Sequence, residues 1–418
     1  MIVKCFIMIK RISAGFVNLV NMNKLFKHQK DFLKEDHNKK LLVWETGTGK
    51  TLTSIEWAKE KSDRILVICP KALKENWARE IDKWSDIPAR FAIVTKEEFR
   101  RDWDKASSFN CIIVDEMHYF SGMKSAMSKS LEKYTKKHEP EFILGLTATP
   151  FMSNPWSIYR LSNLLGYNLN WRAFRDEFFY EVRMGRRLIP VMKNKKEKDV
   201  ALLVKRMGSV VKLNDCVDVP ESVHELETFK LTTEQEKAIK EVVDILPIVR
   251  YTKHHQICGG SLKGDDYTES QRFKCDKLDR VLELIQENNK AIVVSRYNEE
   301  GAMICDFIRE NSKSKVFIIN GSIKNRDEVI QEFNSTDNSV LVCQAACSEG
   351  WEAPTCDTMI FYSYDYSLKN YIQMCGRIQR INNIHKCKYI SLVVPKTIDE
   401  EVYKSIQRKE DFHVELYK

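Results

Sequence analysis

The sequence predicts an α/β protein made of two lobes, each built on a parallel sheet with helices on both faces. Short, fully apolar runs alternate with helical stretches, and this alternation occurs twice along the chain. Strands that are apolar throughout are typical of parallel sheets that are covered on both faces. A chain of 418 residues with 43% hydrophobic content has ample material for more than one core.

The predicted strands fall into two sets. The first set comprises Leu41–Trp44, Ile65–Cys69, Phe91–Val94, Ile112–Val114 and Phe142–Leu146. The second set comprises Ala291–Val294, Val316–Ile319, Val340–Val342, Met359–Phe361 and Tyr389–Val393. Helical stretches separate the runs within each set, so each set is expected to form one lobe.

The region between the two sets, 151–288, has a different character. Aromatic-rich helical stretches, Trp156–Leu165 and Trp171–Val182, precede a basic run, Lys193–Lys198. An extended segment follows later, and Thr233 with Glu236 matches the capping box that starts a helix. We therefore expect helical insertions between the lobes. The expected domains are an N-terminal tail at 1–22, a first lobe with its helical insertion at 23–220, and a second lobe at 221–418.

Composition limits the class of protein. The net charge of +8 is compatible with a polyanionic partner. The twelve cysteines include no Cys-x-x-Cys, which favours free thiols in a reducing cytosol over a disulfide framework. No apolar stretch is long enough for a membrane span, and no signal-peptide cleavage site follows the apolar start. We expect a cytoplasmic protein that is not secreted and has no membrane partner.

Residues 45–51 read ETGTGKT directly after the first predicted strand. A glycine-bearing turn of this kind lets backbone N–H groups surround phosphate oxygens, with Lys50 on the β/γ-phosphates and Thr51 on magnesium. The full P-loop pattern has a glycine where this chain has Trp44. An ordinary strand–turn–helix is the alternative interpretation.

Two further motifs also follow strand ends. Asp115 and Glu116 come directly after an apolar run, and His118 lies close behind. One carboxylate at such a position can hold magnesium, and a second can orient the attacking water. Thr147 and Thr149 follow a later strand and could sense the nucleotide, although a polar turn explains either motif equally simply.

The segment from Gln373 to Arg380 carries two arginines three residues apart, Arg377 and Arg380, which a helix would place on one face. Guanidinium groups supplied from a second lobe suit the negative charge that spreads during phosphoryl transfer. A solvated basic helix face is the alternative.

Taken in order, these motifs resemble those of the superfamily 2 helicases and translocases. From about residue 25 to 412 the chain most resembles the Swi/Snf-type DNA-dependent ATPases. The segments that favour this branch are Leu25-x-x-His28-Gln29, Cys69-Pro70-Lys71 with Asn76-Trp77, Leu231-Thr232 with Gln235, and Thr397–Glu401. The stretch Ser348–Pro354 departs from the branch, because its Gly350 is followed by Trp-Glu-Ala-Pro and is closer to other superfamily 2 helicases.

The resemblance implies two tandem RecA-like lobes that use ATP and Mg²⁺. It implies catalytic roles for Lys50, Glu116, Arg377 and Arg380. It implies nucleotide contacts from Gln29, Thr46, Gly47, Thr48, Gly49, Lys50, Thr51, Gly350 and Gln373. Thr51 and Asp115 are the implied magnesium ligands, and His118, Thr147 and Thr149 are the implied coupling residues.

The expected function is ATP-driven movement along duplex DNA through contacts to the phosphate backbone. Three alternatives stay open: a strand-separating helicase that acts on forks or recombination intermediates, an ATP-gated binding subunit without motor output, and an RNA-stimulated motor. Whether the chain also binds a protein partner stays open. The small size suits a phage, plasmid or bacterial genome-maintenance protein, so the expected setting is a prokaryotic or phage-infected cell.

Overall fold

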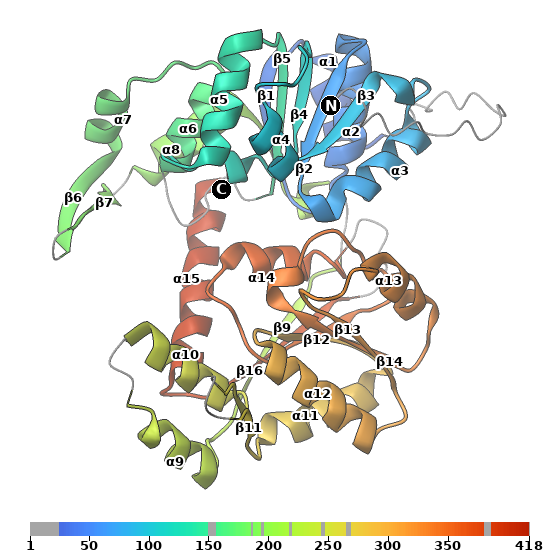
Figure 1. Ribbon diagram of the computed structural model, residues 1–418, viewed down its shortest axis with the longest axis vertical. Helices are drawn as coiled ribbons and strands as arrows, with labels where there is room; N and C mark the ends of the chain where they lie inside the picture. The colour runs from blue at the N-terminus through green and yellow to red at the C-terminus, as the bar shows by residue number, and fades with distance from the viewer. Residues whose placement is uncertain are drawn as a thin grey trace. The chain divides into compact units, whose positions relative to one another are not determined.

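The computed structural model describes residues 25–148, 156–184, 187–193, 196–216, 220–243, 247–264, 269–379 and 386–417. The chain divides into two compact units between residues 218 and 219. Each unit contains a six-stranded sheet in which every neighbouring pair of strands is parallel. The predicted fold class, two α/β lobes with parallel sheets, is therefore confirmed (Figure 1).

The sheet of the first unit has the order β3-β2-β4-β5-β1-β8. Its strands are β1 Lys39–Trp44, β2 Ile65–Cys69, β3 Phe91–Thr95, β4 Cys111–Val114, β5 Phe142–Thr147 and β8 Gly208–Val211. The helices of this unit are α1 Lys27–Lys34, α2 Lys50–Lys61, α3 Lys74–Trp84, α4 Lys96–Asp102, α5 Ala126–His138, α6 Trp156–Leu164, α7 Trp171–Phe178 and α8 Glu197–Met207. Each of the five predicted strands is present, and each extends the predicted apolar run by at most two residues.

Alternate residues of the strands in the first unit face opposite helical layers. One layer joins Leu42, Val67 and Leu144 of the sheet to apolar side chains of α1, α2 and α3, such as Phe32, Ile55 and Trp77. The other face is covered by α4, whose Phe99 contacts Tyr134 of α5. Because both faces are covered, the polar groups of this sheet gather where its strands end.

The sheet of the second unit has the order β13-β14-β12-β15-β16-β9. Its strands are β9 Val223–Thr228, β12 Lys290–Ser295, β13 Lys315–Ile319, β14 Ser339–Gln344, β15 Thr358–Phe361 and β16 Lys388–Val393, beside the short pair β10 Ser261–Leu262 and β11 Gln271–Arg272. The helices are α9 Thr233–Glu241, α10 Pro247–Cys258, α11 Asp276–Asn288, α12 Asn298–Asn311, α13 Arg326–Ser335, α14 Leu368–Cys375 and α15 Ile398–Tyr417.

The core of the second unit also has two layers. Side chains of α13, α14 and α15, such as Phe333, Tyr371 and Val402, pack on one face of the sheet. Side chains of α11 and α12, such as Leu284 and Ile304, pack on the other face. Among the described residues, no helix combines the length and apolar character that crossing a bilayer requires.

The structure corrects two predictions in the region between the strand sets. The helix predicted at Trp171–Val182 ends at Phe178, and a β-hairpin follows, formed by β6 Phe179–Met184 and antiparallel β7 Arg187–Met192. The aromatic and β-branched residues after Phe178 pair across the hairpin instead of continuing the helix. The capping box of α9 uses Thr232 and Gln235 rather than Thr233 and Glu236: the Thr232 hydroxyl accepts from the N–H of Gln235, and the Gln235 side chain accepts from the N–H of Thr232.

Candidate functional site

The loop that joins β1 to α2 carries the Gly-Lys-Thr motif at the carboxyl edge of the first sheet. Gly47 and Gly49 have φ angles of 85° and 83°, in the left-handed region that favours glycine. A Cβ atom on Gly49 would also lie only 2.3 Å from the Gln29 amide nitrogen. The loop therefore needs glycine at this position for both conformation and space, and it delivers Lys50 and Thr51 to the first turn of α2.

The Lys50 ammonium group folds over this loop. Its Nζ donates to the carbonyl oxygens of Trp44 at 2.7 Å and Glu45 at 3.0 Å. Thr48 is buried, and its hydroxyl donates to the Glu45 carbonyl at 2.7 Å. The half-buried Thr46 completes the turn. The Lys50 cation and the first N–H groups of α2 thus belong to the same turn, and N–H groups at a helix start together with a cation are suited to phosphate groups.

The first helix is fastened to the same loop. Gln29 is only 1% exposed, and its Nε2 donates to the carbonyl oxygen of Gly49 at 3.3 Å while its Oε1 accepts from the Phe26 N–H at 2.8 Å. The ring nitrogen Nε2 of His28 lies 2.9 Å from the Thr48 carbonyl oxygen. The structure therefore places the sequence-predicted Gln29 directly against the predicted phosphate loop.

The departure at Trp44 has a structural explanation. Trp44 is fully buried as the last residue of β1, and its indole N–H donates to the Ser209 hydroxyl of β8 at 2.9 Å. Its ring meets those of His28 and Phe32 edge-on, at 4.8 and 5.9 Å between centroids. A large side chain at this position fills the space between α1 and the edge strand β8.

The acid pair follows β4, which lies two strands from β1 across β5. The N–H of Asp115 donates to the Ile68 carbonyl at 2.8 Å, and one carboxylate oxygen of Asp115 accepts from the Glu116 N–H at 2.9 Å. The other oxygen accepts from the indole N–H of Trp77 at 2.8 Å. Trp77 is a site residue to which sequence reasoning gave no role, because it lies 38 positions away on α3 and its ring is otherwise core.

Glu116 has a left-handed backbone with φ of 50°, which turns its side chain away from the strand direction. One Glu116 carboxylate oxygen lies 3.0 Å from Nδ1 of the buried His118. The same ring nitrogen lies 3.1 Å from the hydroxyl of Thr147, at the end of β5. The structure thus brings together three residues that the sequence predicted separately.

The electrostatics of the pair fit a divalent cation. Burial, together with the neighbouring Glu116 carboxylate, raises the pKa of Asp115 above its ordinary value. A hard cation that takes oxygen ligands would offset this penalty, and the chain offers the Asp115 carboxylate and the Thr51 hydroxyl as such ligands. The donor set therefore fits magnesium.

In the second unit, the remaining predicted residues gather around α14. Gly350 has a φ of 88°, and the buried Ser348 hydroxyl before it donates to the Gln373 side-chain oxygen at 3.0 Å. The buried Arg377 follows α14; its Nε donates to the Gln373 carbonyl at 2.9 Å and its Nη1 to the Trp351 carbonyl. Thr149, Arg380 and the predicted tail at 1–22 lie outside the described residues.

Comparison with known proteins finds three family models that match parts of this chain. The family model of the SNF2-related domain matches residues 27–104, and the model of the helicase conserved C-terminal domain matches residues 274–382. A model named for the type III restriction enzyme res subunit matches residues 94–152. The first two matches fall in the first and the second unit, in the order that the motifs predicted.

The curated relatives include the ISWI chromatin-remodeling complex ATPase ISW1 of Saccharomyces cerevisiae, which is 21% identical over 88% of this chain and 38% of its own length. The CHD3-type chromatin-remodeling factor CHR7 of Arabidopsis thaliana is 22% identical over 91% of this chain and 36% of its own length. The chain thus spans about two fifths of the length of these relatives. A solved Sulfolobus solfataricus SWI2/SNF2 ATPase core in complex with dsDNA has 19% identity and a TM-score of 0.42, and the match covers 93% of this chain and 91% of that one.

These relatives overturn one expectation. The prokaryotic or phage-infected cytoplasm predicted from the small size is wrong, because the curated relatives come from yeasts, a plant and animals. Several are named as chromatin-remodelling ATPases, factors or complex subunits, and one is named as a nuclear protein. The chain thus carries matches to a SNF2-related domain and to a helicase conserved C-terminal domain, and it is similar to the Swi/Snf-type ATPases of helicase superfamily 2.

Proposed function

We propose that the chain hydrolyses ATP with Mg²⁺ in a DNA-dependent manner and uses the energy to move along duplex DNA. The observation that carries the proposal is that Lys50, Asp115 and Glu116 follow strands β1 and β4 at one edge of the sheet, with Asp115 half-buried and Glu116 buried. In this proposal Lys50 holds the β/γ-phosphates and Glu116 orients the attacking water. Thr51 and Asp115 would hold Mg²⁺, which would supply neutralisation of the charge on the phosphates.

We further propose that the second unit completes the site, with Gly350, Gln373, Arg377 and Arg380 on the nucleotide. Closing around ATP and reopening after hydrolysis would then shift two grips on the DNA backbone. His118 contacts both Glu116, which follows β4, and Thr147, at the end of β5. This pair of contacts is suited to transmit a change in the position of Glu116 to the end of β5. Thr149 follows β5 in the sequence and is the third coupling residue of the proposal.

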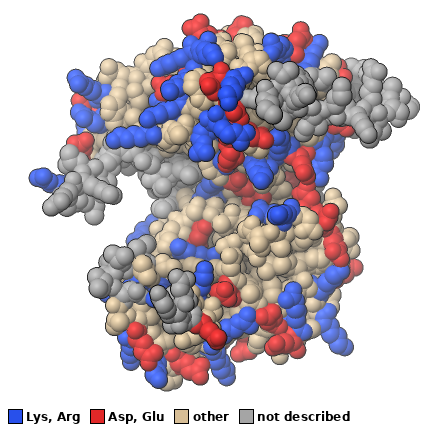
Figure 2. Space-filling view, in the orientation of Figure 1, with Lys and Arg blue, Asp and Glu red and all other residues tan. Residues whose placement is uncertain are grey.

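The proposed partner is duplex DNA, contacted mainly at phosphates. Lysine and arginine side chains are interspersed with acids on the visible face of both units, so no single basic patch stands out there (Figure 2). Contacts of this kind do not depend on base sequence and weaken as salt rises.

The experiment is ATP hydrolysis measured with no nucleic acid and with single-stranded DNA, duplex DNA, forked DNA and duplex RNA. We expect duplex DNA to stimulate the rate most, with a half-saturating concentration that rises steeply with salt. Greatest stimulation by RNA would replace the DNA assignment with the RNA motor. A rate that no nucleic acid changes would contradict the motor and leave an ATP-gated binding subunit.

A second candidate function, separation of the two strands of a duplex, is favoured by the β6–β7 hairpin. Within the described chain its strands pair only with each other, and the hairpin projects from the body of the first unit (Figure 1). Phe174 of α7 packs against Phe178 and Phe179 at its base, while Tyr180 is 47% exposed and Arg183 is exposed. Residues 179–198 contain seven basic and two acidic side chains, which suits insertion beside phosphates.

Triplex displacement, which reports movement, and fork unwinding, which reports strand separation, distinguish the two candidates. If strands are separated, the double variant Tyr180→Ala with Arg183→Ala should lose fork unwinding and keep triplex displacement. A parent protein that displaces triplexes and leaves forks intact would exclude the second candidate.

A further inference from the structure

A short loop at the carboxyl edge of the second sheet is joined to α14 by an ion pair. The loop comprises residues 348–353, which follow β14 and the turn Ala345–Cys347 and include Gly350. The Glu349 carboxylate of this Gly350 loop accepts from the ammonium group of Lys369, in the first turn of α14. Only 18% of the Glu349 side chain and 9% of the Lys369 side chain are exposed. Shielding from water makes such a pair stronger than one on an open surface.

The loop and the helix share a second contact beside the ion pair. The buried Ser348 hydroxyl donates to the side-chain oxygen of Gln373 at 3.0 Å. Lys369 and Gln373 are four positions apart and therefore lie on one face of α14. They hold two consecutive loop residues, Ser348 and Glu349. The start of the Gly350 loop is thus aligned with one face of this helix.

The far end of the same loop sets the direction of Arg377. Nε of Arg377 donates to the Gln373 carbonyl at 2.9 Å, and Nη1 donates to the Trp351 carbonyl. The Ala353 N–H donates in return to the Arg377 carbonyl at 3.0 Å. The guanidinium carbon lies 6.0 Å from the ring centre of Trp351, whose indole N–H donates to the Cys347 carbonyl at 2.7 Å. One carbonyl group that orients the guanidinium group therefore belongs to the helix and the other to the loop.

Gly350 separates the two attached parts of the loop. Its φ of 88° lies in the left-handed region, and glycine has more accessible backbone conformations than any other residue. Gly350 by itself therefore does not fix Trp351 relative to Glu349, and bonds on both sides of the glycine are needed to hold the Trp351 carbonyl in one place. On the side before the glycine, the charged bond from Lys369 is stronger than the neutral bond from Ser348.

We propose that Glu349 and Lys369 are positioning residues for ATP hydrolysis. Their ion pair holds the Gly350 loop against α14, and the loop in turn places the carbonyl group that orients Arg377. The inference rests on the proposed function, in which the guanidinium group of Arg377 meets the phosphates of ATP. A reacting group that is displaced by about 1 Å can lose on the order of 100-fold in rate, so a loop that is only loosened should cost less.

An ion pair that only stabilises the second unit is the alternative, and it predicts a different result. A stabilising pair changes the fraction of folded protein and leaves the turnover of each folded molecule unchanged. A positioning pair instead lowers turnover at saturating ATP in protein that still binds the nucleotide. Because Lys50 and the phosphate loop belong to the first unit, ATP binding should persist when the pair is removed.

The test is ATP hydrolysis with and without saturating duplex DNA, with rates divided by the amount of protein that binds a fluorescent ATP analogue. Lys369→Met, which keeps the aliphatic part of the side chain, and Glu349→Gln should each lower kcat about tenfold and change KM for ATP less than about twofold. The matched control is Lys315→Met, which removes another lysine–glutamate pair of the same unit, between Lys315 of β13 and Glu332 of α13. The control variant should behave as the parent.

The double variant Lys369→Met with Glu349→Gln should be no slower than the slower single variant, because each substitution removes the same ion pair. In an Arg377→Lys background, Lys369→Met should add little, because the pair acts through Arg377. Parental kcat for Lys369→Met, or losses that add in either combination, would overturn the inference. A parent with no hydrolysis that duplex DNA stimulates would overturn the proposed function instead.

Discussion

The carboxyl edges of the two sheets carry opposite kinds of charge. In the first unit, half-buried Asp115 and buried Glu116 lie across β5 from a lysine-bearing glycine loop. In the second unit, the edge presents Arg296 and Arg377, backed by buried partners. The central strands of the two sheets are alike, each a short run of mostly buried apolar residues.

The difference therefore resides in the few residues that follow each strand. A parallel sheet supplies a rigid edge, and the residues beyond that edge supply chemistry. The first edge has the groups that the proposed phosphoryl transfer to water would use: Lys50 for phosphates, Asp115 for magnesium and Glu116 for water. The second edge presents the guanidinium groups of Arg296 and Arg377, which are donors suited to binding anions. Substitutions at the two edges test this difference in their charged groups.

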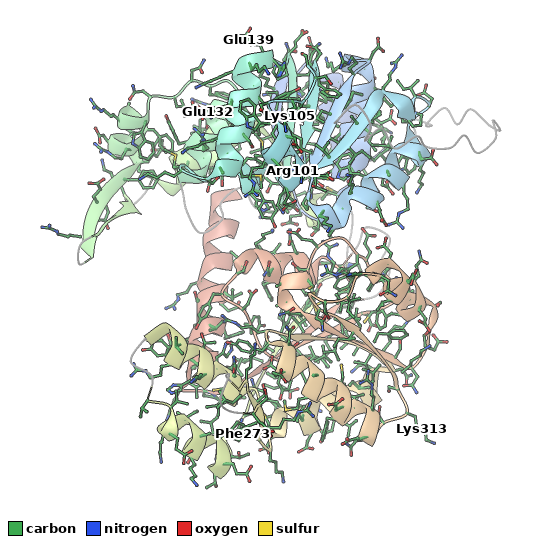
Figure 3. The ribbon with its side chains drawn as sticks, viewed as in Figure 1. Arg101, Lys105, Glu132, Glu139, Phe273 and Lys313 are labelled. Carbon is green, nitrogen blue, oxygen red and sulfur yellow. The ribbon has the colours of Figure 1, made fainter. Side chains whose placement is uncertain are left out.

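Lys50→Ala should have the largest effect, because it removes the cation from the first edge. ATP hydrolysis should fall about 1,000-fold, the upper range for losing one preorganised charge stabiliser, with thermal unfolding close to parental. The matched control is Lys105→Ala, an exposed lysine of the same unit (Figure 3). Parental turnover in Lys50→Ala would remove the phosphate loop from the mechanism.

Glu116→Gln should slow hydrolysis about 100-fold and leave ATP binding intact, since the amide keeps the shape and cannot act as a base. A fluorescent ATP analogue measures binding, and single-turnover hydrolysis measures chemistry. Glu139→Gln is a close control, because Glu139 also has a left-handed backbone, with φ of 46°, but is exposed at the end of α5 (Figure 3). Equal losses of binding and hydrolysis would point to a structural role.

Arg377→Lys tests whether the second edge contributes to chemistry. The lysine keeps the charge but loses the planar pair of donors, so hydrolysis should fall roughly 30-fold. Because Arg377 also donates to the Trp351 carbonyl, circular dichroism and thermal unfolding must accompany the rate. A well-folded variant with parental hydrolysis would confine the chemistry to the first unit.

Trp77→Phe should act through Asp115 alone. It removes the indole N–H that donates to the carboxylate while keeping most of the buried ring volume. The magnesium concentration for half-maximal hydrolysis should rise about tenfold, as for other groups that orient a metal ligand. If the magnesium dependence is parental, Asp115 does not depend on this bond.

Most of the fold and much of the first edge could be predicted from sequence. The ten predicted strands are present because fully apolar runs between helices leave few alternatives to a buried parallel strand. Lys50, Asp115 and Glu116 stand directly after such runs, so their position at a common edge follows from the parallel topology. Local pattern was enough in these cases.

The rest depended on contacts between distant positions. The edge strand β8 is four residues long, and only its pairing with β1 defines it. Trp77 gained its role from Asp115, 38 positions away, and Lys369 from Glu349, 20 positions away. The capping box of α9 was assigned one residue too late, because Thr232 and Thr233 both precede a partner at the right spacing.

The smallest predicted effect concerns the two buried acids beneath the second edge. Burial opposes ionisation of both, yet Lys277 and His255 lower the pKa of Asp399 to about 2. Burial dominates at Glu300 and raises its pKa to about 7, although Ser363 and Lys277 partly oppose this. Glu300 therefore stabilises the fold below its unfolded pKa, and that stability is lost as pH rises from about 4.5 to about 7.

The Glu300→Gln side chain cannot ionise, so the variant should not lose stability as the pH rises through the pKa of Glu300. Relative to the parent, the variant should unfold at an equal or lower temperature at pH 5 and at a higher temperature, by up to about 5 °C, at pH 8. Glu310→Gln, exposed on the same helix, should shift neither value. A difference between variant and parent that is the same at both pH values would show that Glu300 keeps an ordinary pKa. The second edge would then hold two ionised acids, and its contrast with the first would weaken.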